Sequence, residues 1–334
     1  FALGSRSLEF FADRAAGGAF LRPTPPLAGI VAVGALTAAA ATFPSRMRPF
    51  AALGAVALFA ALALPPGPPA PRSGFSVEAL DVGQGDAILL RWDDRALLVD
   101  GGGPFDVEAA DFGRTRLLPK LLDRGVTRLD AVLATHPHPD HALGLLAVVE
   151  ELPVDSLWLS AGEDEGGLFA ALSRTAAAEG IPVSILRPGP PMTWRNARLT
   201  VLHSGGVRRK RDPVNNQSVV LRFERDGRSA VLTGDVGAAT ERALAAGGRL
   251  RPADLLKVAH HGSRTSTTAG FVDALRPRAA LLSCGRENRF GHPAAETLAT
   301  LRGQGVPVFR TDRLSDVRVE LSAARTRLAW RGLE

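Results

Sequence analysis

The sequence predicts an α/β fold, a layered αββα sandwich that is preceded by a two-helix transmembrane hairpin. Short apolar segments alternate with helix-like segments over most of the chain, and such a pattern buries its apolar faces when two sheets pack together with helices outside. Two long uncharged runs near the start predict the hairpin. Histidines and carboxylates also follow several predicted strands, and strand ends are where α/β folds gather functional residues.

Composition limits the possible functions. The 334 residues are enough for about two domains, with 46% apolar and 22% charged residues. The single cysteine, Cys284, excludes an intrachain disulfide framework. Of the net charge of +6, residues 1–74 carry +4 and the remainder only +2, so any contact with nucleic acid must come from local basic clusters. Because the chain starts at Phe1 and not at Met, we expect it to be part of a longer protein.

The first 64 residues have the pattern of a membrane segment. Residues 1–26 are predicted to be amphipathic, and residues 27–43 and 50–64 are uncharged runs of 17 and 15 residues, which is about the length that spans a membrane. The loop between the runs contains Arg46 and Arg48 but no acid. This charge bias predicts that the loop is cytoplasmic and that everything after residue 64 lies outside. Two alanine-rich core helices are the alternative.

Residues 65–74, PPGPPAPRSG, predict a stiff and extended linker. Beyond it the pattern changes to short apolar segments punctuated by glycine, and we expect a separate domain over residues 75–334. Strands are predicted at residues 75–82, 87–92, 96–99, 129–135, 183–186, 199–203, 218–224, 229–233, 255–259, 279–283 and 306–311. Helices are predicted at residues 114–124, 142–152, 168–179, 238–246, 268–275 and 296–304.

The segment THPHPDH at residues 135–141 predicts a metal site. It lies between a predicted strand and a predicted helix, and it places three imidazoles and a carboxylate within six positions. Nitrogen and oxygen ligands of this kind suit zinc, manganese or iron. The two prolines restrict the backbone, so the ligands are held in position. A polar loop with hydrogen-bonded histidines is the alternative.

Other chemically active residues follow predicted strands in the same way. His203, Asp235, and the pair His260 and His261 each stand at the exit of an apolar strand, so we expect them near the motif. The carboxylates Asp81 and Asp86 flank a Gly-Gln-Gly turn, and capping of that turn is their favoured role.

Several segments resemble a known family. Four of them are similar to motifs of the metallo-β-lactamase superfamily: LDVGQGDA from Leu80, HPHPDH from His136, TGD from Thr233 and HHGS from His260. NNQSVVL from Asn215 and NRFGHP from Asn288, together with the hydrophobic runs before them, resemble the C-terminal part of ComEC, a family of competence channels for DNA uptake. The resemblance covers about residues 75–315, and it implies that the sandwich has the metallo-β-lactamase fold.

The resemblance implies two divalent ions, zinc or manganese, about 3.5–4 Å apart. The matching ligands form two groups with one bridging residue: His136, His138 and the candidate His203; Asp140, His141 and one of His260 and His261; and Asp235 between the ions. Adjacent residues at a strand end point in opposite directions, so we expect only one of His260 and His261 to bind metal. We favour His261 and leave His260 to contact the substrate. A buried structural histidine is the alternative for His203.

The two ions imply hydrolysis of a phosphodiester by a bridging hydroxide, with Asp140 orienting it. His292 is expected to donate a proton to the leaving oxygen or to grip a phosphate, and capping of a turn is the alternative. Three polar residues are expected to bind phosphate, support ligands or close loops: Asn215, Ser218 and Ser263. Four consecutive cations predict either a clamp on the DNA backbone or a solvated loop: Arg208, Arg209, Lys210 and Arg211.

We therefore expect a metal-dependent nuclease domain of a ComEC-like channel, in a multi-pass membrane protein with the hydrolase outside the cytoplasm. DNA, the membrane and other parts of the uptake machinery are the expected partners. With no Tyr and only four Trp, stacking platforms are scarce, which favours contacts with the DNA backbone. The alternatives are an inactive, metal-stabilised gate or DNA guide, and a metallo-hydrolase of another phosphoester, a wall-polymer ester or a lactam.

Overall fold

The structure, a computed structural model, describes residues 50, 53–54, 71, 73–104, 111–164, 167–205, 213–322 and 326–330. The chain divides into two compact units: Phe1–Pro69 with Pro119–Thr127, and Ala70–Leu118 with Arg128–Glu334. The fold that follows is that of the second unit.

The predicted transmembrane hairpin at residues 27–64 falls almost entirely outside the described residues, as do residues 1–26 and most of the predicted linker. Within the part of the chain that is described, no helix has the length and apolar character that crossing a membrane requires. The hairpin stays a prediction.

The first sheet contains eight of the described strands, in the order β15-β14-β1-β2-β3-β4-β5-β6. Neighbours are antiparallel from β15 to β3 and parallel from β3 to β6. The strands are β1 (Phe75–Ala79), β2 (Ile88–Trp92), β3 (Arg95–Val99), β4 (Ala131–Ala134), β5 (Leu157–Ser160), β6 (Val183–Leu186), β14 (Val317–Leu321) and β15 (Thr326–Trp330).

The second sheet contains seven of the described strands, in the order β13-β12-β11-β10-β9-β8-β7. Neighbours are parallel from β13 to β10 and antiparallel from β10 to β7. The strands are β7 (Met192–Trp194), β8 (Ala197–His203), β9 (Val220–Arg225), β10 (Arg228–Leu232), β11 (Leu255–Lys257), β12 (Ala279–Leu282) and β13 (Val308–Arg310).

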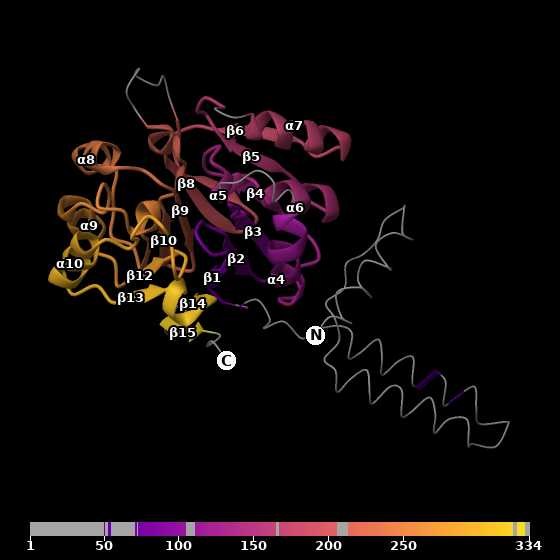
Figure 1. The fold of residues 1–334 in the computed structure, drawn as a ribbon. Coiled ribbons are helices and arrows are strands. Elements are labelled where there is room, and N and C mark those ends of the chain that lie inside the picture. The colour runs from indigo at the N-terminus through magenta and orange to yellow at the C-terminus, as the bar shows by residue number, and fades with distance from the viewer. Residues whose placement is uncertain are drawn as a thin grey trace. The chain divides into compact units, whose positions relative to one another are not determined.

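Helices lie on the outer faces of both sheets (Figure 1). α6 and α7 contact strands of the first sheet, and apolar residues of α8, α9 and α10 pack against the second. The helical segments of this unit are η1 (Gly113–Leu117), α5 (Pro139–Ala142), α6 (Leu145–Glu151), α7 (Leu168–Ala178), η2 (Val214–Gln217), α8 (Ala238–Ala246), η3 (Ala259–Gly262), α9 (Ala269–Leu275), α10 (Ala295–Gly303) and α11 (Thr311–Leu314). All residues of α4 (Leu118–Leu122) except Leu118 belong to the first unit.

Aromatic side chains join the two sheets within the core. Phe75 and Trp92 of the first sheet and Phe223 of the second are fully buried, and the ring of Phe223 lies 4.7 Å from that of Phe75 and 4.9 Å from that of Trp92. The indole N–H of Trp92 donates to the backbone oxygen of Arg195 at 2.8 Å, so its only polar group is satisfied. This contact fixes one sheet against the other.

The predicted αββα sandwich is confirmed, but some boundaries differ. The strand predicted at residues 255–259 ends at Lys257, because a 3-10 turn follows in which His260 and His261 have positive φ. The helix predicted at residues 114–124 is a π-helical turn followed by the short helix α4. Several short elements were not predicted, among them β5, β7, α5, α11, η2, β14 and β15. Elements of three to five residues carry too little periodicity to be recognised.

Removal of an aromatic ring from this core is expected to destabilise the fold. Phe223→Ala leaves a cavity between the sheets and should lower the free energy of unfolding by about 3–5 kcal/mol. The control is Ile185→Ala, since Ile185 is 48% exposed on β6 and its truncation should cost less than about 1 kcal/mol. Urea denaturation measures both variants, and equal losses would contradict this description of the core.

Candidate metal centre

The loop between β4 and α5 carries the HxHxDH motif. Pro139 is the first residue of α5, a position that proline tolerates because the N–H it lacks has no partner within the helix. His136, Asp140 and His141 are 0%, 3% and 0% exposed. Burial of this many ionisable groups is costly unless they are compensated.

Two histidines of this loop face each other. Nε2 of His136 lies 3.1 Å from Nδ1 of His138, while Nδ1 of His136 lies 3.2 Å from the hydroxyls of Thr135 and Ser218. Two nitrogens that each lie about 2.0 Å from one tetrahedral zinc ion are roughly 3.3 Å apart. The pair is therefore spaced as two ligands of one cation.

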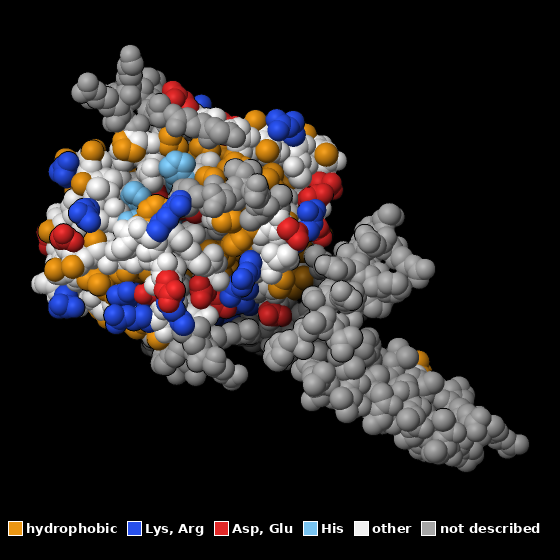
Figure 2. All heavy atoms as spheres, viewed as in Figure 1, with side chains coloured by type: hydrophobic (Ala, Val, Ile, Leu, Met, Phe, Trp, Pro, Cys, Tyr) orange, Lys and Arg blue, Asp and Glu red, His pale blue; other side chains and the backbone are white. Residues whose placement is uncertain are grey.

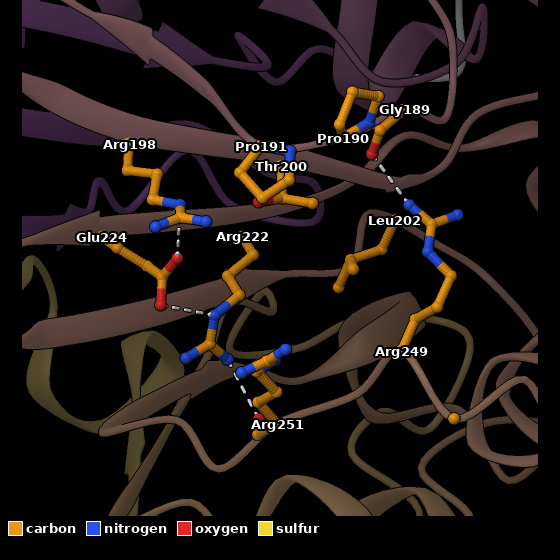
Figure 3. A pocket seen from close by; sticks show the side chains of 11 residues that line it. Gly189, Pro190, Pro191, Arg198, Thr200, Leu202, Arg222, Glu224, Arg249 and Arg251 are labelled. Atoms are coloured by element: carbon orange, nitrogen blue, oxygen red, sulfur yellow. Dashed lines mark hydrogen bonds and ion pairs between the residues drawn. The ribbon is translucent and has the colours of Figure 1, made fainter.

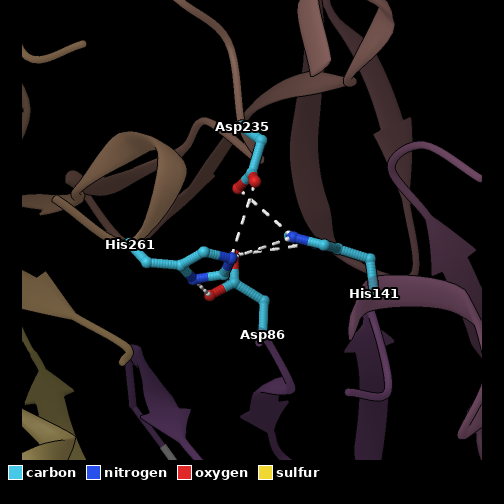
Figure 4. A group of neighbouring side chains, drawn as sticks. All are labelled: Asp86, His141, Asp235 and His261. Carbon is cyan, nitrogen blue, oxygen red and sulfur yellow. Dashed lines mark hydrogen bonds and ion pairs between the residues drawn. The ribbon is translucent and has the colours of Figure 1, made fainter. Parts of the chain in front are cut away.

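Carboxylates and imidazoles from both sheets meet beside this pair. Nε2 of His141 lies 3.3 Å from Nε2 of His261 and 3.3 Å from Oδ1 of Asp235. Nε2 of His261 lies 3.3 Å from Oδ2 of Asp140 and 3.5 Å from Oδ2 of Asp235. Figure 4 shows His141, Asp235 and His261 converging on one point together with Asp86. The sequence predicted that His141, His261, Asp235 and Asp140 would lie together, but it did not predict Asp86 among them.

The electrostatics of this group favour a bound cation. Burial alone lowers the pKa of both His141 and His261, but Asp235 and neighbouring carboxylates reverse this effect. As a result the pKa of His141 is well above its usual value and that of His261 is raised to about 10. Burial raises the pKa of Asp235, yet His141 and His261 hold it well below its usual value. The buried carboxylates are thus stabilised by positive charge, which either protons on the imidazoles or a metal ion can supply.

A further observation agrees with a metal. Oδ1 of Asp140 is buried and accepts no hydrogen bond from the described residues, although buried carboxylate oxygens are nearly always paired. Imidazole nitrogen and carboxylate oxygen are ligands of zinc and manganese. The residues therefore fit one or more divalent cations.

Outer contacts orient the histidines. Nδ1–H of His141 donates to Oδ2 of Asp100 at 2.8 Å, and Nδ1–H of His261 donates to the backbone oxygen of Ser283 at 3.0 Å. The hydroxyl of Thr135 donates to Asp100 at 2.7 Å and can therefore accept the Nδ1–H of His136. These bonds leave the Nε2 lone pairs of all three histidines free for a metal ion.

Asp86 supports the centre from behind. Its carboxylate forms a buried ion pair with Lys257 and lies 3.3 Å from Nδ1 of His261. Burial raises the pKa of Asp86, but Lys257 and His261 lower it to about 2. Gly85, at φ +140°, lies so close to the backbone of Asp140 that a Cβ would collide with it. Asp81 has the favoured turn-capping role, since its Oδ1 accepts the N–H of Gly83. Asp86 instead contacts Lys257 and His261.

His260 lies at the rim of the centre. Both His260 and His261 have left-handed backbone, with φ of 51° and 52°, so they do not point in opposite directions from a strand as expected. His261 turns inward, whereas the side chain of His260 is 28% exposed, with Nε2 3.8 Å from Oδ2 of Asp235. The amide nitrogen of Asn215 lies 3.3 Å from both that Oδ2 and Nε2 of His260. Histidine side chains reach the surface on the face shown in Figure 2.

His292 completes the rim. Its ring lies 5.7 Å from that of His260, and Asn288 holds its backbone through two hydrogen bonds of 2.7 and 2.9 Å. Phe290 stacks on His292 at 5.7 Å, with the guanidinium of Arg289 5.2 Å from the Phe290 ring centre. Burial, followed by the nearby His261 and His260, lowers the pKa of His292 to about 4.

The other predicted site residues differ in whether they contact a predicted ligand. Oγ of Ser218 accepts the N–H of Asp235 at 3.0 Å, so it supports a predicted ligand. Oγ of Ser263 accepts the N–H of Thr265 at 3.3 Å, which closes a turn. His203 donates from Nε2 to the backbone oxygen of Asn216 at 2.7 Å, and burial lowers its pKa. The run Arg208–Arg211 lies outside the described residues.

Comparison with known proteins agrees with this geometry. Residues 80–286, more than half of the chain, match the model of the metallo-β-lactamase superfamily. The chain belongs to this superfamily. It is 30% identical over 256 residues to ComE operon protein 3 of Bacillus subtilis and 30% identical over 244 residues to competence protein ComA of Neisseria gonorrhoeae. The predicted resemblance to ComEC-family competence proteins is confirmed.

These matches cover only part of each relative. They take in 71% and 72% of this chain but 32% of each relative. Recombination protein 2 of Haemophilus influenzae is 27% identical over 262 residues, which is 76% of this chain and 31% of that protein. The chain thus spans about a third of the length of these relatives.

Several residues of this metallo-β-lactamase centre were not predicted from the sequence. Asp100, Ser283 and Gln84 contact its histidines. Gln84 lies within the LDVGQGDA segment, but no contact of its side chain was predicted, and Asp100 and Ser283 stand in no motif that signals a ligand. Lys257 did carry a signal, because a lysine in an otherwise apolar predicted strand is rarely buried without a partner. Its partner Asp86 is 171 residues away in the chain, which hid the pair from a local reading of the sequence.

Breaking the buried pair of Lys257 and Asp86 is expected to be costly. Lys257→Met leaves the Asp86 carboxylate buried without its cation, and it should lower the free energy of unfolding by about 3–5 kcal/mol. The double variant Lys257→Met with Asp86→Leu removes both charges and should recover much of this loss. Urea denaturation in EDTA measures both, and a loss below about 1 kcal/mol in the single variant would contradict the role given to this pair.

Proposed function

We propose that this chain is the metal-dependent nuclease domain of a DNA-uptake protein and hydrolyses phosphodiester bonds in DNA. The observation that carries the proposal is the buried cluster of carboxylates and imidazoles, whose outer members His138, His260 and His292 are only partly buried. A substrate can therefore reach the cluster from solvent. Divalent cations bound there lower the pKa of water and neutralise charge on phosphoryl oxygens.

Two cations are proposed. His136 and His138 are assigned to one, since their ring nitrogens face each other at 3.1 Å. Asp140, His141 and His261 are assigned to the other, with Asp235 as the carboxylate between the two groups. The predicted role of His203 as a third ligand of the first cation stays a prediction, because its Nε2 is bonded to the Asn216 backbone.

Asp140 has two proposed roles. Its Oδ2 lies 3.3 Å from Nε2 of His261, within the ligand group. Its Oδ1 has no hydrogen bond from the described residues, so it is available to accept a proton from the attacking water and to orient that water.

His292 is assigned to phosphate binding. Oε1 of Gln84 accepts the N–H of Gly285 at 3.1 Å, which turns the Gln84 amide nitrogen toward Nδ1 of His292 at 3.5 Å. Nδ1 is therefore an acceptor, and the ring proton lies on Nε2. Because the pKa of about 4 keeps the ring neutral at pH 7, His292 donates a hydrogen bond to a phosphate oxygen and is a poor source of a proton for the leaving group. His260, beside it, contacts the same phosphate.

DNA as the substrate and a membrane channel as the setting rest on the relatives and on the sequence. The relatives are named ComE operon protein 3, competence protein ComA and recombination protein 2. The uncharged runs at residues 27–43 and 50–64 and the basic run Arg208–Arg211 agree with a membrane-tethered domain that handles DNA. We propose that the hydrolase domain lies outside the cytoplasm and degrades DNA beside the channel.

The test is cleavage of end-labelled single- and double-stranded DNA by the chain with Mn²⁺ or Zn²⁺. Asp140→Asn should lower the cleavage rate by at least about 100-fold. Asp81→Asn is the matched control, because it also neutralises a carboxylate but keeps the Oδ1 that caps the turn, and it should keep activity within about threefold. The absence of cleavage by a wild-type chain with bound metal would contradict the nuclease proposal and favour a gate or another ester substrate.

A further inference from the structure

A basic groove lies on the outer face of the second sheet, away from the metal centre. It consists of two adjoining pockets of about 630 and 280 Å³ that share Arg222 and Glu224 in their linings. No lining residue belongs to the metal cluster. Figure 3 shows the larger pocket, with side chains of β8 and β9 as its floor and Arg249 and Arg251 beside them.

The alternation of β8 and β9 explains why this face is polar. Leu199, Val201, Leu221 and Phe223 point into the core between the sheets, so the residues between them point outward. Near β10, β11 and β12 the outer face is apolar and is covered by α8, α9 and α10. At β8 and β9 most of the outward positions are instead polar or charged: Arg198, Thr200, Arg222 and Glu224. This part of the sheet is built to face solvent or a charged partner.

The groove concentrates the positive charge of the chain. Its lining contains seven arginines and two carboxylates, Glu224 and Asp254, which is a net charge of +5, whereas the whole chain has a net charge of +6. The arginines are Arg198, Arg222, Arg228, Arg249, Arg251, Arg276 and Arg278. Residues 75–334 together carry a net charge of only +2, so positive charge is concentrated on this surface, which is the kind of local cluster that a polyanion needs.

The carboxylates of the groove are already engaged. Glu224 pairs with Arg222 at 3.0 Å and lies 3.9 Å from Arg198, and Asp254 pairs with Arg228 at 2.8 Å and lies 3.6 Å from Arg278. Among the residues that the structure describes, Arg249, Arg251 and Arg276 form no ion pair. Three guanidinium groups are thus left to meet an external anion.

Backbone contacts hold the cations in place. Arg222 is only 7% exposed, and its guanidinium donates to the backbone oxygens of Arg251 and Pro252, each at 2.9 Å. This fixes the segment that carries Arg251. Arg249 donates to the backbone oxygen of Gly189 at 2.9 Å, which positions it across the groove. Cations that are already positioned lose little side-chain entropy when an anion binds.

We propose that this groove binds the sugar–phosphate backbone of a nucleic-acid strand at a site separate from the metal centre. Its cations are all arginines, whose planar guanidinium matches a phosphate in a bidentate manner. The described lining contains no aromatic side chain, so bases have nothing to stack on and binding is independent of sequence. A recessed surface suits a strand better than it suits a flat layer of anionic lipid.

The test measures DNA binding without metal, so that it does not depend on the proposed nuclease activity. Anisotropy of a fluorescein-labelled single-stranded oligonucleotide is followed in EDTA with the whole chain. Arg249→Glu with Arg251→Glu should weaken binding at least about tenfold and lower the slope of log K against log[salt] by about 1 to 2. Metal content and the circular dichroism spectrum of this variant should be unchanged.

The matched control is Arg174→Glu with Arg302→Glu, which changes the net charge equally at two exposed arginines outside the groove. It should weaken binding less than about twofold. The proposal would be overturned if both double variants weakened DNA binding equally, or if neither weakened it. Vesicles with and without phosphatidylserine form the second arm: groove-dependent binding to the anionic vesicles but not to DNA would also overturn it.

Discussion

The structure depends on the compensation of three buried carboxylates, Asp86, Asp140 and Asp235. Carboxylates this deeply buried must be paired with positive charge, because the energetic cost of an uncompensated charge in the interior exceeds the stability of a typical fold. Lys257 supplies a permanent cation to Asp86. Asp140 and Asp235 face imidazoles, which meet the same requirement either by taking up protons or by sharing a divalent cation with the carboxylates. The charge of a centre built this way therefore favours a cation, whatever substrate the centre acts on.

The fold meets this requirement by bringing strand ends of two sheets to one place. His141 and Asp140 follow β4 of the first sheet, whereas Asp235 and His261 follow β10 and β11 of the second. The aromatic contact of Phe223 with Phe75 and Trp92 therefore does more than fill the core, because it fixes the relative position of the two halves of the centre. The outer face of the second sheet carries the proposed nucleic-acid groove, where the alternation of β8 and β9 leaves arginines without a covering helix.

Much of the centre was predictable because its signals are local. The HxHxDH loop holds four ionisable side chains within six residues, and the αββα order follows from the alternation of apolar patterns. The long-range pairs were hidden: Lys257 with Asp86, Asp100 with His141, and β1 with β14. The favoured choice of His261 over His260 agrees with the geometry, but for a different reason than expected, namely two left-handed residues in a turn. Position at a strand exit alone does not decide whether His203 is a ligand, since its Nε2 donates to the backbone oxygen of Asn216.

The most direct test of this account is the number of divalent cations that the chain binds. Isothermal titration of the metal-free chain with Zn²⁺ or Mn²⁺, checked by elemental analysis, is predicted to give two sites per chain, with tight binding lost in Asp235→Asn and kept in Asp81→Asn. Asp235→Asn preserves the size of the side chain and removes only its charge, so a loss of binding reports the carboxylate itself. Failure of the wild-type chain to bind either metal, or equal binding by wild type and Asp235→Asn, would contradict the account.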